Sequence, residues 1–257
     1  MSSESEYHDA MIAFLQLIWG DGFMAPGGEG NVANLVEGLD IRGKRVLDIG
    51  CGLGGPACLL AGEYGAYVVG TDLESRLVDL STERAKKLNL TARTEFRVVE
   101  PGPLMFPDES FDAVLSCGAF TQIENKRGMF AECLRVLKPG GALTCYDWMK
   151  CEGEYSEDML YWFKMEGLTY AMETPERHRE LLREAGFTQV EIRDRSDWFR
   201  RKVQEEFEFI QSELYPQMRE LIGQKDADHF VENWRSMVVV CDKREMLQVY
   251  SRARRTS

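Results

Sequence analysis

The sequence lacks a long apolar run: no stretch of 18 consecutive apolar residues occurs in its 257 residues. That absence predicts that no helix spans a membrane. The N-terminal stretch MSSESEYHDAM carries acids where a secretory signal peptide has a basic region followed by an apolar one. We therefore expect a cytoplasmic protein.

Basic charge is also scarce, with 31 Lys and Arg against 43 Asp and Glu, which gives a formal net charge of −12. Such an acidic chain repels phosphate backbones and anionic lipid headgroups. A local cluster of Arg252, Arg254 and Arg255 is too small to reverse this. We expect neither a nucleic-acid nor a membrane partner, and the sequence leaves open whether the chain is a monomer or a homodimer.

Metal-ligand and disulfide patterns are missing. The seven cysteines form no CxxC pair, and the histidines, His8, His178 and His229, are far apart in the sequence. A structural or catalytic zinc site needs three or four such ligands at defined spacings. We expect no metal, and we expect reduced thiols that are mostly buried.

Alternating strands and helices are what the sequence does contain. Short apolar runs alternate with helical patterns of about ten to fifteen residues, which is typical of an α/β protein with a Rossmann-like, mostly parallel sheet covered by helices on both faces. We predict helices within 51–65, 75–90, 126–137 and 174–187, a turn at 138–141, and seven strands at 45–50, 66–72, 94–100, 110–116, 142–148, 187–194 and 244–255.

Two segments interrupt this alternation. Residues 148–173 are rich in Met, Trp and Tyr but have no clean period, and residues 195–242 are acidic, aromatic and helical in period. We interpret both as lid segments over a pocket. No repeat or linker divides the chain, so we predict one domain over 1–257.

A glycine-rich turn, VLDIGCGLGG, follows the first strand. Glycines without a Cβ let the backbone approach a ligand closely. A dinucleotide fold would place a pyrophosphate there, but Asp48 at the strand end would repel phosphates and could instead accept hydrogen bonds from an ammonium group. Asp72 ends the next strand, 22 residues after Gly50, where a carboxylate can bind both hydroxyls of a ribose. S-adenosylmethionine has a ribose, an ammonium and no phosphate. Alternatively, both acids cap backbone amides at an NAD or nucleotide-sugar site.

With these motifs, and with FPDESFDAVLS and LRVLKPGGALTCYDW further on, nearly the whole chain resembles the class I SAM-dependent methyltransferases. The resemblance implies S-adenosylmethionine as cofactor, S-adenosylhomocysteine as product, and no metal. It assigns Asp48, Gly50 and Gly52 to the methionine end and the loop, and Asp72 and Leu73 to the ribose and adenine. It assigns Glu100 and Pro101 to the adenine amino group and ring, and Cys117 and Gly118 to the floor of the transfer site.

A narrower resemblance is to the phosphoethanolamine N-methyltransferases and related small-amine methyltransferases. It lies in YHDAMIAFLQLIWGDGFMAPGG, in YDW after the fifth strand, in RDRSDWFRRKVQEEFEFI and in the ENW…VYSRARR ending. It implies an N-terminal helical cap over the cofactor, with Tyr7 and Trp19 facing the site and Tyr7 a candidate catalytic residue. Ordinary helix packing is the alternative explanation for both side chains.

The chain departs from that family at the acceptor end. The family has an acid and a histidine, four residues apart, after the fourth strand, where this sequence has Gly118 and Gln122. Neither residue can act as a base near neutral pH. The family's phosphate-binding arginine falls at about Leu168, with Lys164 and Tyr170 nearby. These departures argue against phosphoethanolamine itself as the acceptor.

A base is needed only if the nucleophile must lose a proton, because alignment supplies much of the acceleration in methyl transfer. A neutral tertiary amine or a thioether loses none, and aromatic faces stabilise the cationic product. We therefore expect Gln122 in catalysis and a mixed aromatic and cationic acceptor site. Its candidates are Gln122, Trp148, Tyr161, Lys164 and Tyr170, with Tyr155 and Trp162 as further aromatics and Arg127, Arg195, Arg200 and Arg201 as further cations.

The leading hypothesis is methyl transfer to the nitrogen of a small aliphatic amine, either a phosphobase or a glycine-betaine-type precursor. Two alternatives remain from the sequence. One is an S- or O-methyltransferase of a small carboxylic acid metabolite, which the missing acid–histidine pair favours. The other is a SAM-binding protein without catalysis.

Overall fold

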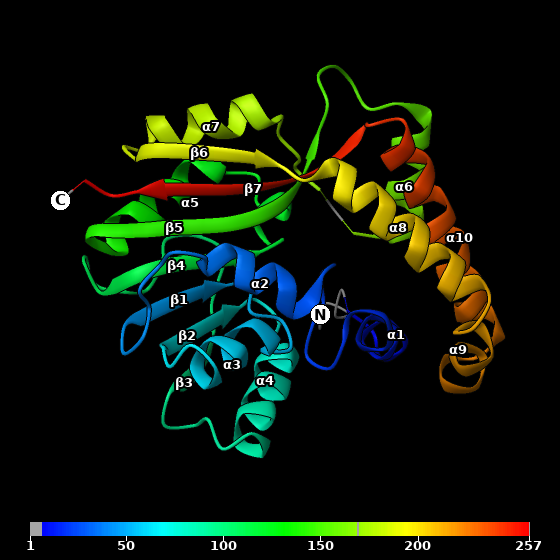
Figure 1. Ribbon diagram of the computed structural model, residues 1–257, viewed down its shortest axis with the longest axis horizontal. Coiled ribbons are helices and arrows are strands. Elements are labelled where there is room, and N and C mark those ends of the chain that lie inside the picture. Colours follow the sequence, from blue (N-terminus) through cyan, green and yellow to red (C-terminus); the bar gives the residue numbers. More distant parts are fainter. Residues whose placement is uncertain (1–6, 169, 257) are drawn as a thin grey trace.

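The computed structural model describes residues 7–168 and 170–256. Seven strands form one sheet in the order β3-β2-β1-β4-β5-β7-β6 (Figure 1). All neighbours are parallel except β7, which is antiparallel to both β5 and β6. This confirms the predicted fold class. The strands are β1 Arg45–Ile49, β2 Tyr67–Asp72, β3 Thr94–Val98, β4 Phe111–Cys117, β5 Leu137–Lys150, β6 Thr188–Asp194 and β7 Met246–Arg254.

The central strands are buried on both sides, which explains why their sequences are continuous apolar runs. Helices α2 (Gly28–Val36) and α3 (Gly55–Gly62) cover one face, with α4 (Ser75–Lys87) beside α3. Helices α5 (Lys126–Val136) and α7 (Pro175–Glu184) cover the other. Strand order reverses between β1 and β4, and ligands bind in such sheets beyond the carboxyl ends of the strands at that point.

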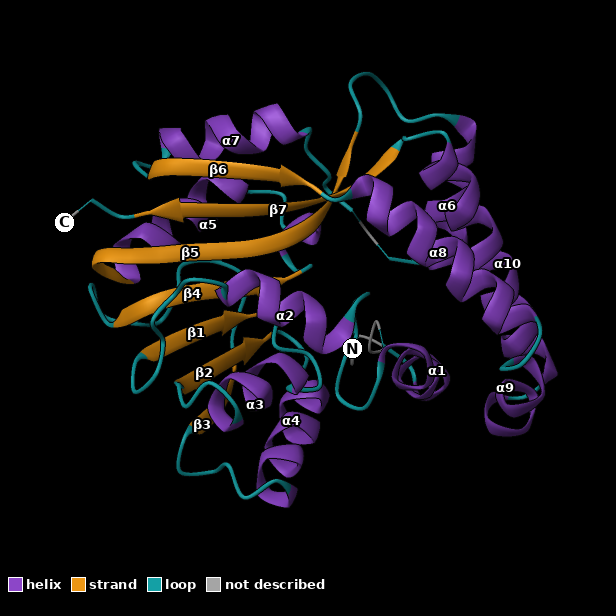
Figure 2. Ribbon diagram, viewed as in Figure 1, coloured by secondary structure: helices purple, strands orange, loops and turns teal. Residues whose placement is uncertain are grey.

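A separate group of helices lies beyond those carboxyl ends, on the right in Figure 2. Its members share one hydrophobic cluster, distinct from the clusters on the two sheet faces, and the fully buried Trp162 and Phe199 belong to it. They are α1 (Asp9–Trp19), α6 (Glu157–Glu166), α8 (Ser196–Gln211), α9 (Tyr215–Ile222) and α10 (Gln224–Asp242).

Two local predictions differ from the structure. Residues 138–141, expected as a turn, belong to β5, and the register against β4 shifts between Phe111 and Ala113. The insertion without a clean period contains helix α6. Its boundaries have ordinary causes, because the Ser156 side chain accepts a hydrogen bond from the Met159 amide and Gly167 ends the helix with φ 74°. Thr174, the first residue of the helix predicted within 174–187, is the N-cap of α7, and its side chain accepts a hydrogen bond from the Arg177 amide.

The predicted absences concern cysteines, metals and membranes. All seven cysteines are unpaired, and five of them are buried. Among the described residues, no group of His, Cys, Asp and Glu side chains has the arrangement to bind a metal ion. No helix in the same part of the chain is both long and apolar enough to cross a membrane.

Candidate active site

A cavity of about 870 Å³ is lined by loops at the carboxyl edge of the sheet and by residues of α1 and α6 from the group of helices beyond it. Its size is within the range usual for small-molecule sites. The loops after β1, β2, β3 and β4 line one part, which we call the cofactor half. The end of β5, helix α6 and the segment after α6 line a second part together with Gln122, and we call this the acceptor half. The N-terminal segment and α5 contribute further lining residues.

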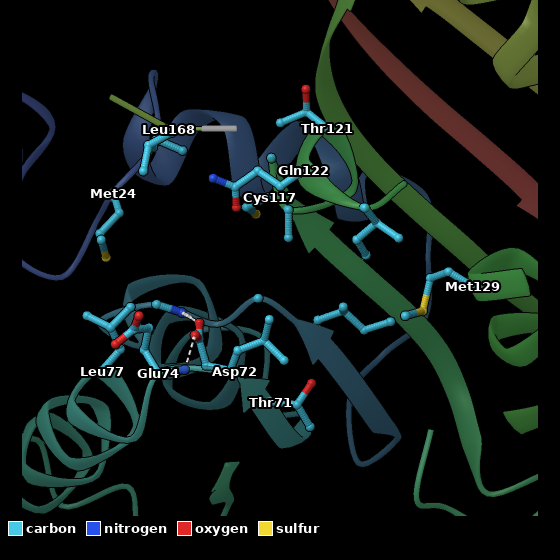
Figure 3. Close-up of a pocket in the computed structure, with 18 of the residues that line it drawn as sticks. Met24, Thr71, Asp72, Glu74, Leu77, Cys117, Thr121, Gln122, Met129 and Leu168 are labelled. Carbon is cyan, nitrogen blue, oxygen red and sulfur yellow. Dashed lines mark hydrogen bonds between the residues drawn. The ribbon is translucent and has the colours of Figure 1, made fainter. Parts of the chain in front are cut away.

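Asp72 organises the cofactor half. Its Oδ2 accepts a hydrogen bond of 2.9 Å from the Gly52 amide, and its Oδ1 accepts one of 3.1 Å from the Glu74 amide (Figure 3). Burial raises the pKa of Asp72 despite these bonds. Each carboxylate oxygen has a second lone pair, so a side chain already fixed by two amides can still accept hydrogen bonds from a diol in the cavity.

The glycine turn is shaped by close packing. Gly50 has φ 71° and Gly52 has φ 52°, a region that favours glycine. A Cβ on Gly50 would lie 2.3 Å from the Cβ of Ala119, and a Cβ on Gly52 would lie 3.0 Å from the Sδ of Met24. The glycines therefore let the loop after β4 and the N-terminal cap approach the turn, and both glycines line the cavity.

Asp48 does not itself line the cavity. Its side chain is fully buried in β1, and neither carboxylate oxygen has a hydrogen-bond partner among the described residues. Burial, together with the charge of Asp72, raises the pKa of Asp48 to about 7. The expected direct contact is thus corrected to a buried carboxylate close to the turn. Such an orphaned carboxylate fits a ligand with a positively charged group nearby, because that charge would stabilise its ionised form.

The residues expected around an adenine lie at the mouth of the cavity. Leu73, Glu100 and Pro101 all line it and are exposed, Leu73 at 57%. The residues expected at the floor, Cys117 and Gly118, also line the cavity. The structure therefore brings the predicted cofactor residues other than Asp48 together along one side.

A network around Thr121 fixes Gln122. The Thr121 amide donates to Oδ1 of the buried Asp147 at 3.0 Å, and the Thr121 hydroxyl donates to the Trp148 carbonyl at 3.1 Å. The Ala171 amide donates to the Thr121 carbonyl at 2.8 Å. These bonds join the loop after β4 to the end of β5 and to the lid. As a result, the Gln122 amide extends into the cavity opposite Asp72 (Figure 3).

Aromatic rings surround the acceptor half. Trp148 and Tyr170 line the cavity, with ring centroids 5.9 Å apart. Trp162 lies behind them, fully buried and stacked on Tyr170 at 5.1 Å. Trp162 thus supports the site without lining it.

Two predicted acceptor residues do not reach the cavity. Tyr161 is 41% exposed, and its hydroxyl donates to Oε1 of Glu232 at 2.6 Å. Lys164 is exposed and does not line the cavity either. The helical period explains this correction, because α6 turns these positions away from the face that carries Trp162. The other candidate cations, Arg127, Arg195, Arg200 and Arg201, also lie outside the lining.

Glu166 was missed by the sequence analysis. This half-buried residue, the last of α6, lines the cavity, and its Oε2 accepts a 2.6 Å hydrogen bond from Nδ2 of Asn233 on α10. Its Oε1 accepts one of 3.2 Å from the Tyr170 hydroxyl. In the sequence it is one of several acids in the insertion, and nothing in the pattern distinguishes it from Glu157.

The N-terminal cap completes the cavity. Tyr7 and Trp19 both line it, as the resemblance implies. The Trp19 indole also donates to Oε1 of the buried Glu206 at 3.2 Å, and the Trp234 indole donates to Oε2 at 3.2 Å. Glu206 therefore ties α1 to both α8 and α10.

Comparison with known proteins shows similarity to methyltransferases. The family model described as a methyltransferase domain matches residues 47–145. Phosphoethanolamine N-methyltransferase 1 from Zea mays is 31% identical over 232 residues, which are 90% of this chain and 45% of that protein. The phosphoethanolamine N-methyltransferase of Plasmodium falciparum (isolate 3D7) is 26% identical over 245 residues, 94% of this chain and 90% of that protein.

Among solved structures, phosphoethanolamine N-methyltransferase 2 from Haemonchus contortus superposes with a TM-score of 0.90 and 26% identity, over 98% of this chain and 58% of that one. It was solved in complex with phosphomonomethylethanolamine and S-adenosylhomocysteine. This chain spans about half the length of the curated plant relatives that it matches.

Proposed function

We propose that this chain transfers a methyl group from S-adenosylmethionine to the nitrogen of a small aliphatic amine. Its residues 47–145 match the methyltransferase-domain family, and its fold is that of the Rossmann-like methyltransferases. The observation that carries the proposal is the cavity itself. It joins a ribose-type carboxylate, Asp72, to an aromatic acceptor half within one enclosure under a lid.

Asp72 would bind the ribose hydroxyls, and the glycine turn at Gly50 and Gly52 would lie against the methionine portion. Bound there, S-adenosylmethionine supplies an electrophilic methyl group on a sulfonium. Tyr7 and Trp19 would cover it from the N-terminal cap, while Leu73, Glu100 and Pro101 would flank the adenine at the mouth. The buried Asp48 would stabilise the ammonium end electrostatically at a distance rather than by a lining contact.

On the acceptor side, Gln122 would orient the nucleophile by hydrogen bonding, since its amide cannot remove a proton. Cys117 and Gly118, which line the cavity, would form the floor, and Gly118 has open space where a side chain would be. Residues 148–173 and 195–242 would act as the lid that excludes water and aligns the reactants. The lone pair of a neutral amine then attacks without a protein base.

The seven unpaired cysteines support a cytoplasmic location for this activity, because reducing compartments keep thiols free. A SAM-binding protein without catalysis is the second candidate. It is favoured by Gly118 and Gln122, which offer no base at the transfer site.

Calorimetric titration with S-adenosylhomocysteine tests the cofactor assignment. Replacing Asp72 by Ala should weaken binding about a hundredfold, because two hydrogen bonds to a charged group are lost. Asp72→Asn, which keeps an acceptor oxygen, should lose less. The exposed Asp79→Ala on the neighbouring helix is the matched control. Unchanged affinity in Asp72→Ala would exclude this site. Turnover of an amine panel, read by mass spectrometry as added methylene units, separates the enzyme from the non-catalytic candidate.

A further inference from the structure

The charged side chains that line the cavity are all acidic, although one of them, Glu132, is paired with Arg135. Among the described residues that line it, none is Lys, Arg or His. The basic side chain closest in sequence to Gln122 is Lys126, whose ammonium donates to the backbone carbonyls of Ile123, at 2.8 Å, and Ala171. Six lining residues are acidic: Asp72, Glu74, Glu100, Glu124, Glu132 and Glu166.

Glu166 differs from the other five because the lid contributes it. It lies two residues before Leu168 and four before Tyr170, both of which also line the cavity. Its carboxylate accepts hydrogen bonds from two neutral donors, Asn233 at 2.6 Å and Tyr170 at 3.2 Å. A carboxylate has about four lone-pair sites. The two contacts thus orient Glu166 without neutralising it.

The surroundings of Glu166 add further negative potential. It is the last residue of α6, and Gly167, with φ 74°, turns the chain away after it. A helix C-terminus carries a partial negative charge and favours a cation. Burial raises the pKa of Glu166, although the hydrogen bonds from Asn233 and Tyr170 lower it. A positively charged ligand would stabilise both the carboxylate and the helix end.

The aromatic rings are suited to the same ligand. Trp148 and Tyr170 present π systems to the cavity, and such rings attract alkylammonium groups within about 6 Å of their centroids. Leu168, where the resembling family has its phosphate-binding arginine, offers only methyl groups to the cavity (Figure 3). A phosphate or carboxylate here would be desolvated beside Glu166 without a counterion, which is strongly unfavourable.

We propose that the acceptor of this chain is a small organic cation with no phosphate or carboxylate group, and that Glu166 is the residue that selects it. The inference rests on the proposed methyltransferase function and narrows its substrate class. Glu166 holds the ammonium form of the amine electrostatically, Asn233 positions the carboxylate, and the rings of Trp148 and Tyr170 contact the alkyl groups. For methyl transfer the bound ammonium releases its proton to water, and the lone pair of the resulting neutral nitrogen attacks the methyl group. The charge pattern of the cavity thus selects the unphosphorylated amine over its phosphate ester.

Binding of choline and of phosphocholine to the full chain saturated with S-adenosylhomocysteine tests this directly. Choline has a quaternary nitrogen without a lone pair, so binding is measured without N-methylation. We expect choline to bind at least tenfold more tightly than phosphocholine. Glu166→Gln should weaken choline binding about tenfold to a hundredfold, since a charge-assisted contact is lost. Glu157→Gln, the same change at the exposed start of α6, should have no effect.

The affinity for S-adenosylhomocysteine, measured in the same titrations, should be equal in wild type, Glu166→Gln and Glu157→Gln. If S-adenosylhomocysteine does not bind to wild type, the proposed function itself fails. If it binds but phosphocholine equals or exceeds choline, or Glu166→Gln leaves choline affinity unchanged, only the present inference is overturned. As a gain-of-function test, Glu166→Gln combined with Leu168→Arg should reverse the preference towards phosphocholine by at least tenfold.

Discussion

The two halves of the cavity are built in different ways. In the cofactor half, Gly50, Gly52 and Asp72 lie close together in the sequence, and the main hydrogen bonds are between a carboxylate and backbone amides. In the acceptor half, Glu166 and its partner Asn233 are 67 residues apart and meet through side chains on two helices. The backbone thus fixes the cofactor half, while the packing of the lid fixes the acceptor half.

This difference predicts where each half tolerates change. A site formed by backbone amides is sensitive to residues that alter backbone conformation. A site formed by side chains on a helical lid is sensitive to what holds the helices together, and its specificity changes with single polar substitutions. Three substitutions test these expectations, beginning with the largest effect.

Gly50→Ala tests the backbone dependence of the cofactor half. The new Cβ would lie 2.3 Å from the Cβ of Ala119, in a residue with φ 71°. We expect a loss of about 4 kcal/mol in the free energy of unfolding, from the strained φ and the overpacked contact together. Urea denaturation measures this. Gly153→Ala is the control, because it has φ 95° but open space around the Cβ, and should cost only about 1 kcal/mol. Equal costs would show that close packing at the turn is unimportant.

Glu206 tests the attachment of the lid to the N-terminal cap. Burial raises the pKa of Glu206 from its ordinary 4.5 to about 7, although the Trp234 and Trp19 indoles and Lys202 act in the opposite direction. Because the folded state binds this proton more tightly than the unfolded state, its stabilising contribution is complete below pH 4.5. It is lost as the pH rises to about 7, and the total is about 3 kcal/mol.

Glu206→Gln should therefore flatten the decline in unfolding free energy between pH 4.5 and 7, measured by urea titration at several pH values. A smaller slope should remain, because burial also raises the pKa of Asp48 and of Asp147 to about 7. The matched control is Glu205→Gln, which removes the neighbouring, exposed carboxylate and should reduce the slope far less, because burial raises the pKa of Glu206 more than the charge of Glu205 does. An unaltered slope in Glu206→Gln would contradict the role given to this contact.

Gln122→Ala has the smallest expected effect and separates the two halves functionally. Removing one orienting hydrogen bond should lower kcat/KM about tenfold, while the affinity for S-adenosylhomocysteine should stay the same. Steady-state kinetics and calorimetry measure the two quantities. An equal loss of both would place Gln122 in the cofactor half instead.

Sequence reasoning predicted the cofactor half better than the acceptor half. The strands around Asp48 and Asp72, the glycine turn and the order of elements follow from local patterns, and the fold class is confirmed. Asp48 is the exception among those residues, because its side chain does not line the cavity. It lies within a strand, where successive side chains point to opposite faces of the sheet. Tyr161 was expected in the acceptor half as an aromatic ring for a cationic product, and Lys164 as a cation near Leu168. Neither lines the cavity, and the insertion had no visible period that could have shown which way α6 turns them.

The sequence by itself determined the strand–turn–helix unit, the acidic charge and the loss of a basic residue at Leu168, because each depends on residues adjacent in the chain. Only the tertiary structure decided which side chains face the cavity. Whether Glu166 or Glu157 enters it depends on the rotation of α6 against α10, and this rotation is set by the packing of Trp162 with the lid core. Long-range packing of this kind leaves no local periodic signal in the sequence.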